Sequence, residues 1–385
     1  MENQGAWKAE DIIGLVPDEL LDALADETGV DYAVKKLQGK HIFKLFLFGF
    51  LNGRKMSLRI LETISESARF NNLFDAVAKP VKHSGIGMRL NKISYQYFER
   101  IFTHLIASPK LEAVMFDRKK IVASKIDSTI VTLSSKLLKF GLDDNPGYKT
   151  LKFGVSIRAS IPVNIMLFEG QKYLSEDNAL PKLILDNKQK KALNICIFDR
   201  GIQRKQNFAD FSKNNISFVS RLSTQKITVL KDQSFEETET PTLTITNDQI
   251  IRFASDEHMT EEGATTEFRL ITGMTKDTKQ EMKFLTNVLF LSAVEISELY
   301  KSRWEIETFF KFIKQEMNFS HLLSRSENGI KVIMYLTMIA AILLTLYKKM
   351  NQIMGWAVAK LLFLNELDIA MVNEWKDEMR LAYSP

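Results

Sequence analysis

The chain has 385 residues, of which 45% are hydrophobic and 26% charged, an ordinary composition for a globular protein with two or three domains. The single cysteine, Cys196, excludes an internal disulfide framework and a cysteine-based zinc site, and it fits a reducing cytoplasm. The opening MENQGAWKAEDIIG has no basic segment followed by an apolar stretch. We therefore expect no secretory signal and a cytoplasmic protein.

The charges are unevenly distributed along the chain. Residues 1–30 carry one Lys against eight acids, residues 31–120 carry seventeen Lys and Arg against seven acids, and residues 225–290 carry seven against twelve. A basic segment of this size favours a polyanionic partner, above all nucleic acid. The alternative is a basic face without a partner.

Residues 1–115 have the pattern of short helices. An acidic helical segment leads into the apolar run HIFKLFLFGFL, and two basic helical segments follow it. Short helices with scattered Arg and Lys suit a helix-turn-helix-like DNA-binding unit, although any basic helical bundle has the same pattern.

The period changes near Lys119. KKIVASKIDSTIVTL alternates and is rich in β-branched residues, which predicts a strand, and TLKFGVSIRAS and IPVNIMLFEG predict two antiparallel strands. The runs LNICIF and ISFVSRL are typical of buried strands separated by helices. Residues 116–222 therefore predict a mixed α/β layer, and the short alternating runs of residues 223–292 predict a β-rich insertion.

The stretch LYKSRWEIETFFKFIKQEMNFSH, from Leu299 to His321, contains no Pro or Gly and predicts a single helix. On a helical wheel, one stripe gathers the polar residues opposite an apolar face. This stripe contains Tyr300, Arg303, Glu307, Lys311 and Lys314. A carboxylate of this kind can bind a metal, and the cations can bind phosphate oxygens. An ordinary amphipathic helix with solvated charges is the alternative.

The run from Val332 to Tyr347 has sixteen uncharged residues. It is shorter than the roughly 20 residues that a bilayer requires, and lysines flank it, so we favour a buried helix over a membrane span. Residues 351–385 predict a helical tail in which Trp356 and Trp375 pack.

Three acids have surroundings that suggest chemistry. Asp127 lies inside a strand among apolar and β-branched residues, Asp199 follows the buried strand LNICIF, and Glu307 lies on the predicted helix. The two aspartates also have structural interpretations, since Asp127 could hold a neighbouring Lys such as Lys125 or a backbone turn, and Asp199 could cap the helix after Gly201. Together, three carboxylates can hold two Mg²⁺ ions that support in-line attack on phosphorus.

Other metals and cofactors are less favoured. Histidines are few and no HExxH spacing occurs, which disfavours zinc. The GxxxxGK phosphate loop is missing, which argues against an ATPase.

The sequence resembles the bacterial insertion-sequence transposases with a DDE active site and a YREK signature, the insertion-sequence-four family. Four residues reproduce the spacing Y-x2-R-x3-E-x6-K: Tyr300, Arg303, Glu307 and Lys314. The blocks KIDSTIV around Asp127, FDRGI around Asp199 and the later FVSRL match in order and character. The resemblance covers roughly residues 40–350.

The resemblance implies a ribonuclease-H-like catalytic core interrupted by a β-rich insertion. The expected parts are a helical DNA-binding region (1–115), two core segments (116–222 and 293–350) on either side of the insertion (223–292), and a helical tail (351–385).

The resemblance also implies cut-and-paste transposition, in which the freed 3′-hydroxyl often forms a hairpin before strand transfer to target DNA. Asp127, Asp199 and Glu307 would be the catalytic residues and would bind two Mg²⁺ ions, for which Mn²⁺ can substitute. The candidate DNA-binding residues are Tyr300, Arg303, Trp304, Lys311, Lys314 and Arg200. Trp304 could stack on a base pulled from the duplex, or it could be a plain packing residue.

The expected partners are transposon-end DNA and target DNA, with a homodimer holding two ends. Two alternatives remain: a non-catalytic DNA-binding protein derived from a transposase, and a nuclease that cuts without joining strands.

Overall fold

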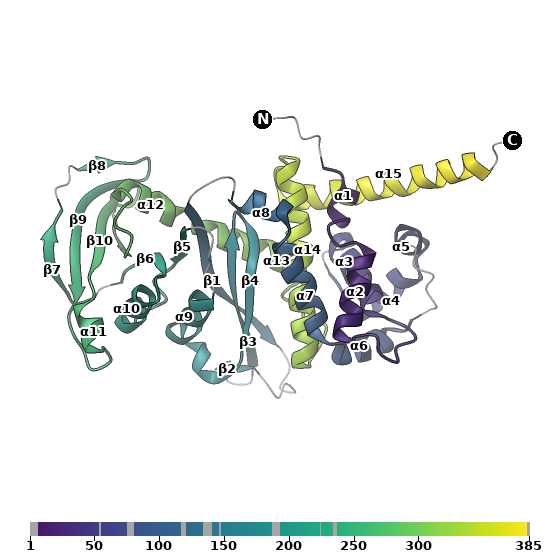
Figure 1. Cartoon of the computed structure of the whole chain (residues 1–385), viewed down its shortest axis with the longest axis horizontal. Helices are drawn as coiled ribbons and strands as arrows, with labels where there is room; N and C mark the ends of the chain where they lie inside the picture. Colours follow the sequence, from purple (N-terminus) through teal and green to yellow (C-terminus); the bar gives the residue numbers. More distant parts are fainter. Residues whose placement is uncertain are drawn as a thin grey trace. The chain divides into compact units, whose positions relative to one another are not determined.

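The computed structural model describes residues 7–53, 55–74, 81–116, 121–133, 141–145, 148–186, 193–223, 225–233 and 237–382. They belong to two compact units, and Figure 1 labels most of their elements. The first unit joins Met1–Val114 to Phe310–Pro385, and the second is Met115–Phe309.

The first unit is helical. Its helices are α1 (Ala9–Ile13), α2 (Asp18–Thr28), α3 (Gly39–Asn52), α4 (Leu58–Glu66), α5 (Ala68–Leu73), α6 (His83–Lys92), α7 (Tyr95–Ile106), most of α8 (Pro109–Phe116), α14 (Glu327–Met350) and α15 (Trp356–Ala382).

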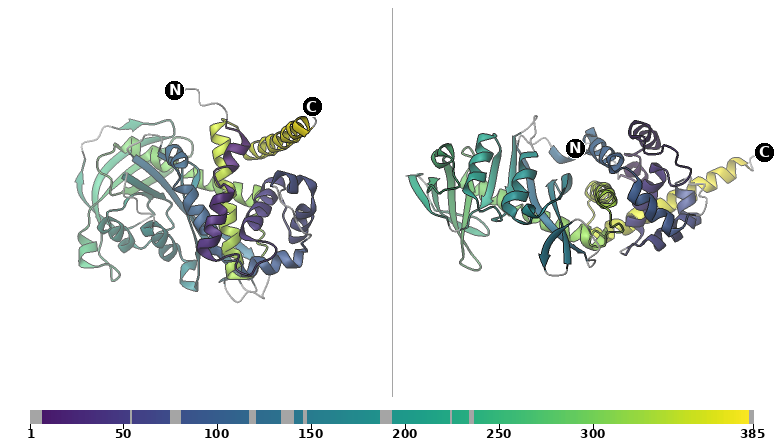
Figure 2. Two further views of the ribbon diagram at one scale, coloured as in Figure 1. Left: turned by 45° about the vertical axis from the view of Figure 1, so that its right-hand side comes forward. Right: turned by 90° about the horizontal axis from the view of Figure 1, so that it is seen from below.

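Helix α14 forms the centre of this unit. Ser326 caps its start by accepting a hydrogen bond from the amide of Gly329, and Lys348 and Lys349 lie in its last turn. The helix is long and apolar enough to cross a membrane, but 94% of its most apolar stretch is buried inside the protein. Figure 2 shows it in yellow-green beside the dark helices of the N-terminal segment. The prediction of a buried helix over 332–347 is confirmed.

The tail is helical from Trp356 on, as predicted, and the Trp356 ring stacks on Phe312 with centroids 3.8 Å apart. The side chain of Trp375 lies outside the described residues.

The second unit is built on one mixed sheet. The described strands are β1 (Ile121–Leu133), β2 (Leu142–Asn145), β3 (Tyr148–Arg158), β4 (Ile161–Phe168), β5 (Leu193–Phe198), β6 (Ser217–Arg221), β7 (Ile227–Asp232), β8 (Thr238–Glu239), β9 (Leu243–Phe253), β10 (Phe268–Thr275) and β11 (Glu281–Thr286). Their order is β2-β3-β1-β5-β6-β11-β10-β9-β7, with β4 beside β3 and β8 beside β9. The mixed α/β class is confirmed.

Strands β1, β5 and β6 are parallel, whereas β3 is antiparallel to both β1 and β4. The predicted pair of antiparallel strands is therefore confirmed. LNICIF is a central strand, as its uninterrupted apolar character indicated.

The two faces of these strands pack against different helices. Cys196 and Phe198 point to the face covered by α9 (Glu176–Asp186) and α10 (Lys205–Lys213). Ile195 and Ile197 point to the other face, where they pack in one cluster with Tyr300 of α12 (Ala293–Lys301). Figure 1 shows α9 and α10 together on one side of the sheet.

Strands β7 to β11 occupy most of the region predicted to be β-rich, together with the short helix α11 (Glu261–Thr265). Arg269 of β10 and Asp248 of β9 form a buried bidentate pair, with nitrogen–oxygen distances of 2.8 and 2.6 Å. This pair fixes the two strands against each other, because a charge left alone there would be costly.

The prediction of a single helix from Leu299 to His321 is wrong. A capping box between Ser292 and Glu295 starts α12, which ends at Lys301, and α13 runs from Trp304 to Glu316. Between them the Ser302 hydroxyl donates to the carbonyl of Leu299 at 2.6 Å, a local bond that competes with helix continuation.

Candidate active site

Asp127 and Asp199 lie side by side where the parallel pairing of β1 and β5 ends: Asp199 directly follows β5, and Asp127 lies in the middle of the longer β1. In β1 and β5, Lys125 pairs with Ile197, and the same register carried two residues further places Asp127 next to Asp199. Because alternate residues share a face of a strand, both aspartates point to the face covered by α12. Ligand sites form at this edge of open α/β sheets.

Asp127 is a carboxyl group in an unfavourable environment. Burial raises its pKa to about 6, and the negative charges of Glu176 and Asp199 add to the effect. A hydrogen bond from the Ser128 amide at 2.7 Å and the positive charge of Arg303 oppose it only in part. A cation beside Asp127 would stabilise its ionised form.

The pKa of Asp199 is shifted in the opposite direction. Burial raises its pKa, but hydrogen bonds from Tyr300 and from the Arg200 amide, with the positive charges of Arg303 and Arg221, outweigh burial and lower the pKa overall. The Tyr300 hydroxyl donates to Oδ1 of Asp199 at 2.7 Å. Asp199 is therefore held as a carboxylate.

Arg303 connects the aspartates to Glu307. Its guanidinium donates to Oε1 of Glu307 at 2.6 Å across one turn, and its side chain is only 13% exposed. Burial acts to lower the pKa of Arg303, but the bond to Glu307 and the charge of Asp199 raise it overall. Among the described residues, the Nε of Arg303 has no hydrogen-bond partner although it is buried. Within the part of the chain that the structure describes, the guanidinium therefore keeps one unused donor, while its charge acts on Asp127 and Asp199.

In this conformation the three acids are not close enough together to coordinate one metal ion. Within the described ranges, no three His, Cys, Asp or Glu side chains are grouped closely enough to hold a metal ion. Asp127 and Asp199 are brought together, whereas Glu307 is engaged by Arg303. The donor set still suits a hard divalent cation, because it consists of carboxylate oxygens and one of the acids is under electrostatic strain.

A cavity of about 480 Å³ lies beside the predicted DNA-binding residues. It is walled by residues of β9, β10, β11, α12 and the start of α13, among them Leu243, Phe284, Tyr300, Arg303 and Trp304. Trp304 lines this cavity and is 64% exposed.

The other candidate DNA-binding residues stand apart from this cavity. Arg200 is exposed directly after Asp199. Lys311 is exposed and Lys314 half-buried, on the part of α13 that belongs to the first unit, and burial lowers the pKa of Lys314. The sequence predicted these cations from their helical spacing, and that spacing is preserved within α13.

Two of the structural alternatives for the aspartates, an ion pair of Asp127 with Lys125 and a cap by Asp199 on the following helix, are wrong. Lys125 forms its ion pair with Glu305, at 3.1 Å, and Asp177 accepts hydrogen bonds from the amides before α10. The third alternative, a backbone contact by Asp127, is met in part, because Asp127 accepts a hydrogen bond from the Ser128 amide at 2.7 Å.

Two features of the site were missed by sequence reasoning. Arg221, the last residue of β6, lies next to Asp199 by the register of β5 and β6, and its place at the end of FVSRL was the available signal. On the opposite face, Glu176 accepts a hydrogen bond from Ser128 at 2.7 Å and forms an ion pair with the buried Lys152 at 2.8 Å. Nothing in the local pattern indicates this second contact.

Comparison with known proteins identifies the family. A model of the transposase DDE domain matches residues 126–343, which is more than half of the chain and spans all three acids. The chain belongs to the DDE transposase family. By family it is an enzyme of the class that cleaves and joins DNA strands.

Curated relatives carry transposase names. "Putative transposase for insertion sequence element IS4SA" of Synechocystis sp. is 26% identical over 266 residues, which are 64% of this chain and 67% of the relative. "Probable transposase for insertion sequence element IS5377" of Geobacillus stearothermophilus is 21% identical over 265 residues, 68% of this chain and 66% of the relative. "Putative transposase y4zB" of Sinorhizobium fredii is 28% identical over 158 residues, and the match spans 41% of this chain and 43% of that protein.

Proposed function

We propose that this transposase carries out Mg²⁺-dependent cut-and-paste transposition: cleavage at the ends of an insertion sequence, followed by strand transfer into target DNA. The observation that carries the proposal is the strand register that sets Asp127 beside Asp199, on the face where Tyr300 and Arg303 reach them. Carboxylates backed by cations at the carboxyl edge of parallel strands suit phosphoryl transfer.

Asp127, Asp199 and Glu307 would hold the metal ions. When bound, two Mg²⁺ ions supply activation of the attacking oxygen and stabilisation of the leaving oxygen. The chain contributes three carboxylates from three separate elements, and it holds Asp199 ionised through Tyr300.

Arg303 would couple DNA binding to completion of the site. In the protein without DNA it neutralises Glu307, and its buried Nε keeps a donor unused among the described residues. A phosphate oxygen arriving there competes for the guanidinium, because Arg binds phosphate with paired donors. Glu307 is then released to join Asp127 and Asp199.

Trp304 and the neighbouring cavity would serve a hairpin step. Forming a hairpin requires a base to leave the stack. At about 480 Å³ the cavity is within the range of small-molecule pockets, so a nucleobase fits, and the exposed Trp304 ring offers a stacking surface at its wall. Lys276 and Lys301 also line it and suit the backbone phosphates.

The fold we propose for the catalytic part is ribonuclease-H-like. The strand order β4-β3-β1-β5-β6, with β1, β5 and β6 parallel, supports it. Strands β7 to β11 come between Asp199 and Glu307 in the chain, where the insertion is expected, and β11 extends the same sheet by pairing with β6.

The working complex we propose contains two chains and two transposon ends, together with target DNA. The basic segment 31–120 and the cations Arg200, Lys311 and Lys314 would neutralise phosphates. Affinity for end DNA should then fall steeply with salt. We place the protein in the cytoplasm, bound to the nucleoid when on DNA.

Substitution of Glu307 by Gln tests the proposal. The variant should bind end DNA but lose Mg²⁺-dependent cleavage by at least about 100-fold. A matched control is Glu298→Gln, which removes an exposed carboxylate of α12 that pairs only loosely, at 3.9 Å, with Lys301. Cleavage by Glu307→Gln at the control rate would remove Glu307 from the mechanism.

The same preparation separates the alternatives. End binding by the wild-type chain without plasmid excision would favour a non-catalytic DNA-binding protein. Cut ends that never become covalently linked to target DNA would favour a nuclease.

A further inference from the structure

Lys125 is a buried cation close to Asp127 on strand β1. It lies two residues before Asp127 on the same face of β1, and only 7% of its side chain is exposed. Its Nζ lies 3.1 Å from Oε1 of Glu305, in the first turn of α13, and the Ser160 hydroxyl contacts the other oxygen of Glu305 at 3.4 Å. A lysine so far from solvent cannot itself bind DNA phosphates.

The acid that meets Lys125 lies on the helix that carries Glu307. Glu305 and Glu307 are two residues apart on α13, so their side chains point about 200° apart around the helix axis. The Arg303 side of the helix faces the aspartates, because Arg303 acts electrostatically on Asp127 and Asp199 and also binds Glu307. Glu305 therefore ties the first turn of α13 to β1 through a side of the helix different from the one that carries Glu307.

We propose that Lys125 and Glu305 are a positioning pair that sets the rotation of α13 above β1 and so aims Glu307 toward the two aspartates. The inference rests on the function proposed above, because it assigns a role within the same site. Through this one contact, the pair links β1, which carries Asp127, to α13, which carries Glu307. Fixing the helix in this way matters, because a displacement of about 1 Å at such a site can cost about 100-fold in rate.

Four variants test the pair: Lys125→Met, which keeps the length and apolar stem, Glu305→Ala, the double variant, and Glu305→Gln, which keeps a hydrogen-bond acceptor. We expect Lys125→Met and Glu305→Ala to keep end-DNA affinity but to need about tenfold more Mg²⁺ for half-maximal cleavage. The double variant should be no worse than either single one, because partners in one contact are not additive. Glu305→Gln should recover much of the loss.

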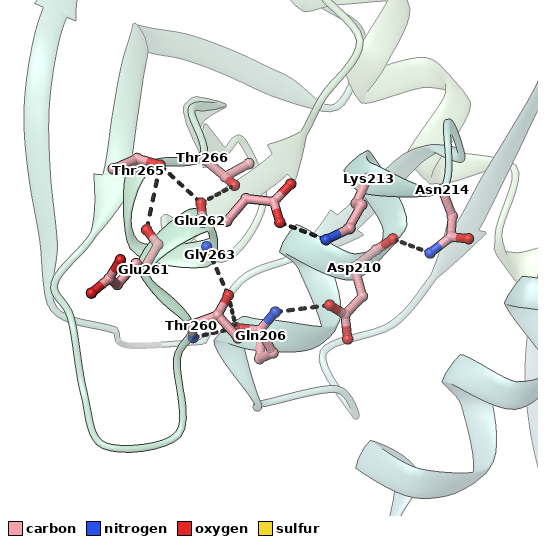
Figure 3. A network of polar contacts seen from close by, with 10 residues as sticks. All are labelled: Gln206, Asp210, Lys213, Asn214, Thr260, Glu261, Glu262, Gly263, Thr265 and Thr266. Carbon is pink, nitrogen blue, oxygen red and sulfur yellow. Dashed lines mark hydrogen bonds and ion pairs between the residues drawn. The ribbon is translucent and has the colours of Figure 1, made fainter.

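A second measurement needs neither DNA nor activity. Hydrogen exchange of the amides in the first turn of α13 should quicken by about tenfold in Lys125→Met and Glu305→Ala, because the contact that holds the turn is lost. Lys213→Met is the matched control, since Lys213 pairs with Glu262 in the exposed contact between α10 and α11 (Figure 3). Neither of those helices carries a metal-ligand candidate.

The outcomes separate this inference from the proposed function. A wild-type chain that never cleaves end DNA would refute the function, while hydrogen exchange would still report on the pair. Unchanged exchange and unchanged Mg²⁺ dependence in both single variants would overturn the positioning role. Faster cleavage in either variant would also overturn it, by showing that the contact restrains Glu307 rather than aiming it.

Discussion

Ionised Asp127 should destabilise the protein in the absence of metal. Its pKa is raised to about 6 from the ordinary 3.8, so the folded state binds this proton more tightly than the unfolded state. Stability from the protonated carboxyl is fully present below about pH 4 and is lost as the pH rises through about 6. A difference of about two pKa units corresponds to about 3 kcal/mol at neutral pH.

The variant Asp127→Asn removes this penalty while keeping an oxygen that accepts the Ser128 amide. Without metal at pH 8, its melting temperature should exceed that of the wild type by about 5 °C or more. The two melting temperatures should converge near pH 4, where Asp127 is protonated. Thermal unfolding followed by fluorescence from pH 4 to pH 8 measures both quantities.

Asp199→Asn is the control with the opposite sign. The pKa of Asp199 is lowered, so its ionised form stabilises the fold above its ordinary pKa, and this stability is lost only as the pH falls through the folded-state value. Its Asn variant should melt below the wild type at pH 8. A variant Asp127→Asn that melts at or below the wild type at pH 8 would refute the strained carboxyl, and with it the argument that this position awaits a cation.

Three further substitutions test the neighbouring contacts. Tyr300→Phe removes the hydrogen bond to Asp199 and should lower the free energy of unfolding by about 1.5–3 kcal/mol, measured in urea; no change would show that the bond adds nothing. Arg303→Gln frees Glu307 but removes a phosphate contact, so the slope of log affinity for end DNA against log salt should fall by about one, and an unchanged slope would contradict that contact. Trp304→Ala should keep the first nick but reduce hairpin product by about tenfold on denaturing gels, whereas normal hairpin yield would exclude base stacking at this position.

The helices and strands that form from a short stretch of sequence were predicted from the pattern of hydrophobic residues in that stretch. Apolar runs and alternation identified β1, β5 and β6, and the uncharged stretch 332–347 became the buried core of α14. The position of Asp199 directly after a buried strand was also visible in the sequence, whereas the parallel register that sets Asp127 beside it comes from long-range pairing of β1 and β5.

The rest depends on contacts between distant residues. The helical pattern continues through Ser302 and Arg303, so the break between α12 and α13 left no trace in composition or periodicity. The grouping of residues 310–385 with the N-terminal helices is likewise a matter of long-range packing. Lys125 was considered a partner for Asp127, its near neighbour, whereas it pairs with Glu305, 180 residues away.

Convergence of three acids on one pair of metal ions is most directly tested by iron-directed cleavage of the protein backbone. Fe²⁺ replaces Mg²⁺ at carboxylate sites, and with added hydrogen peroxide and ascorbate it generates hydroxyl radicals that cut the nearby chain. In the complex with end DNA, mass spectrometry should find cuts next to Asp127, Asp199 and Glu307, all suppressed by excess Mg²⁺. Cuts at the two aspartates but not at Glu307, with DNA bound, would contradict the proposed site.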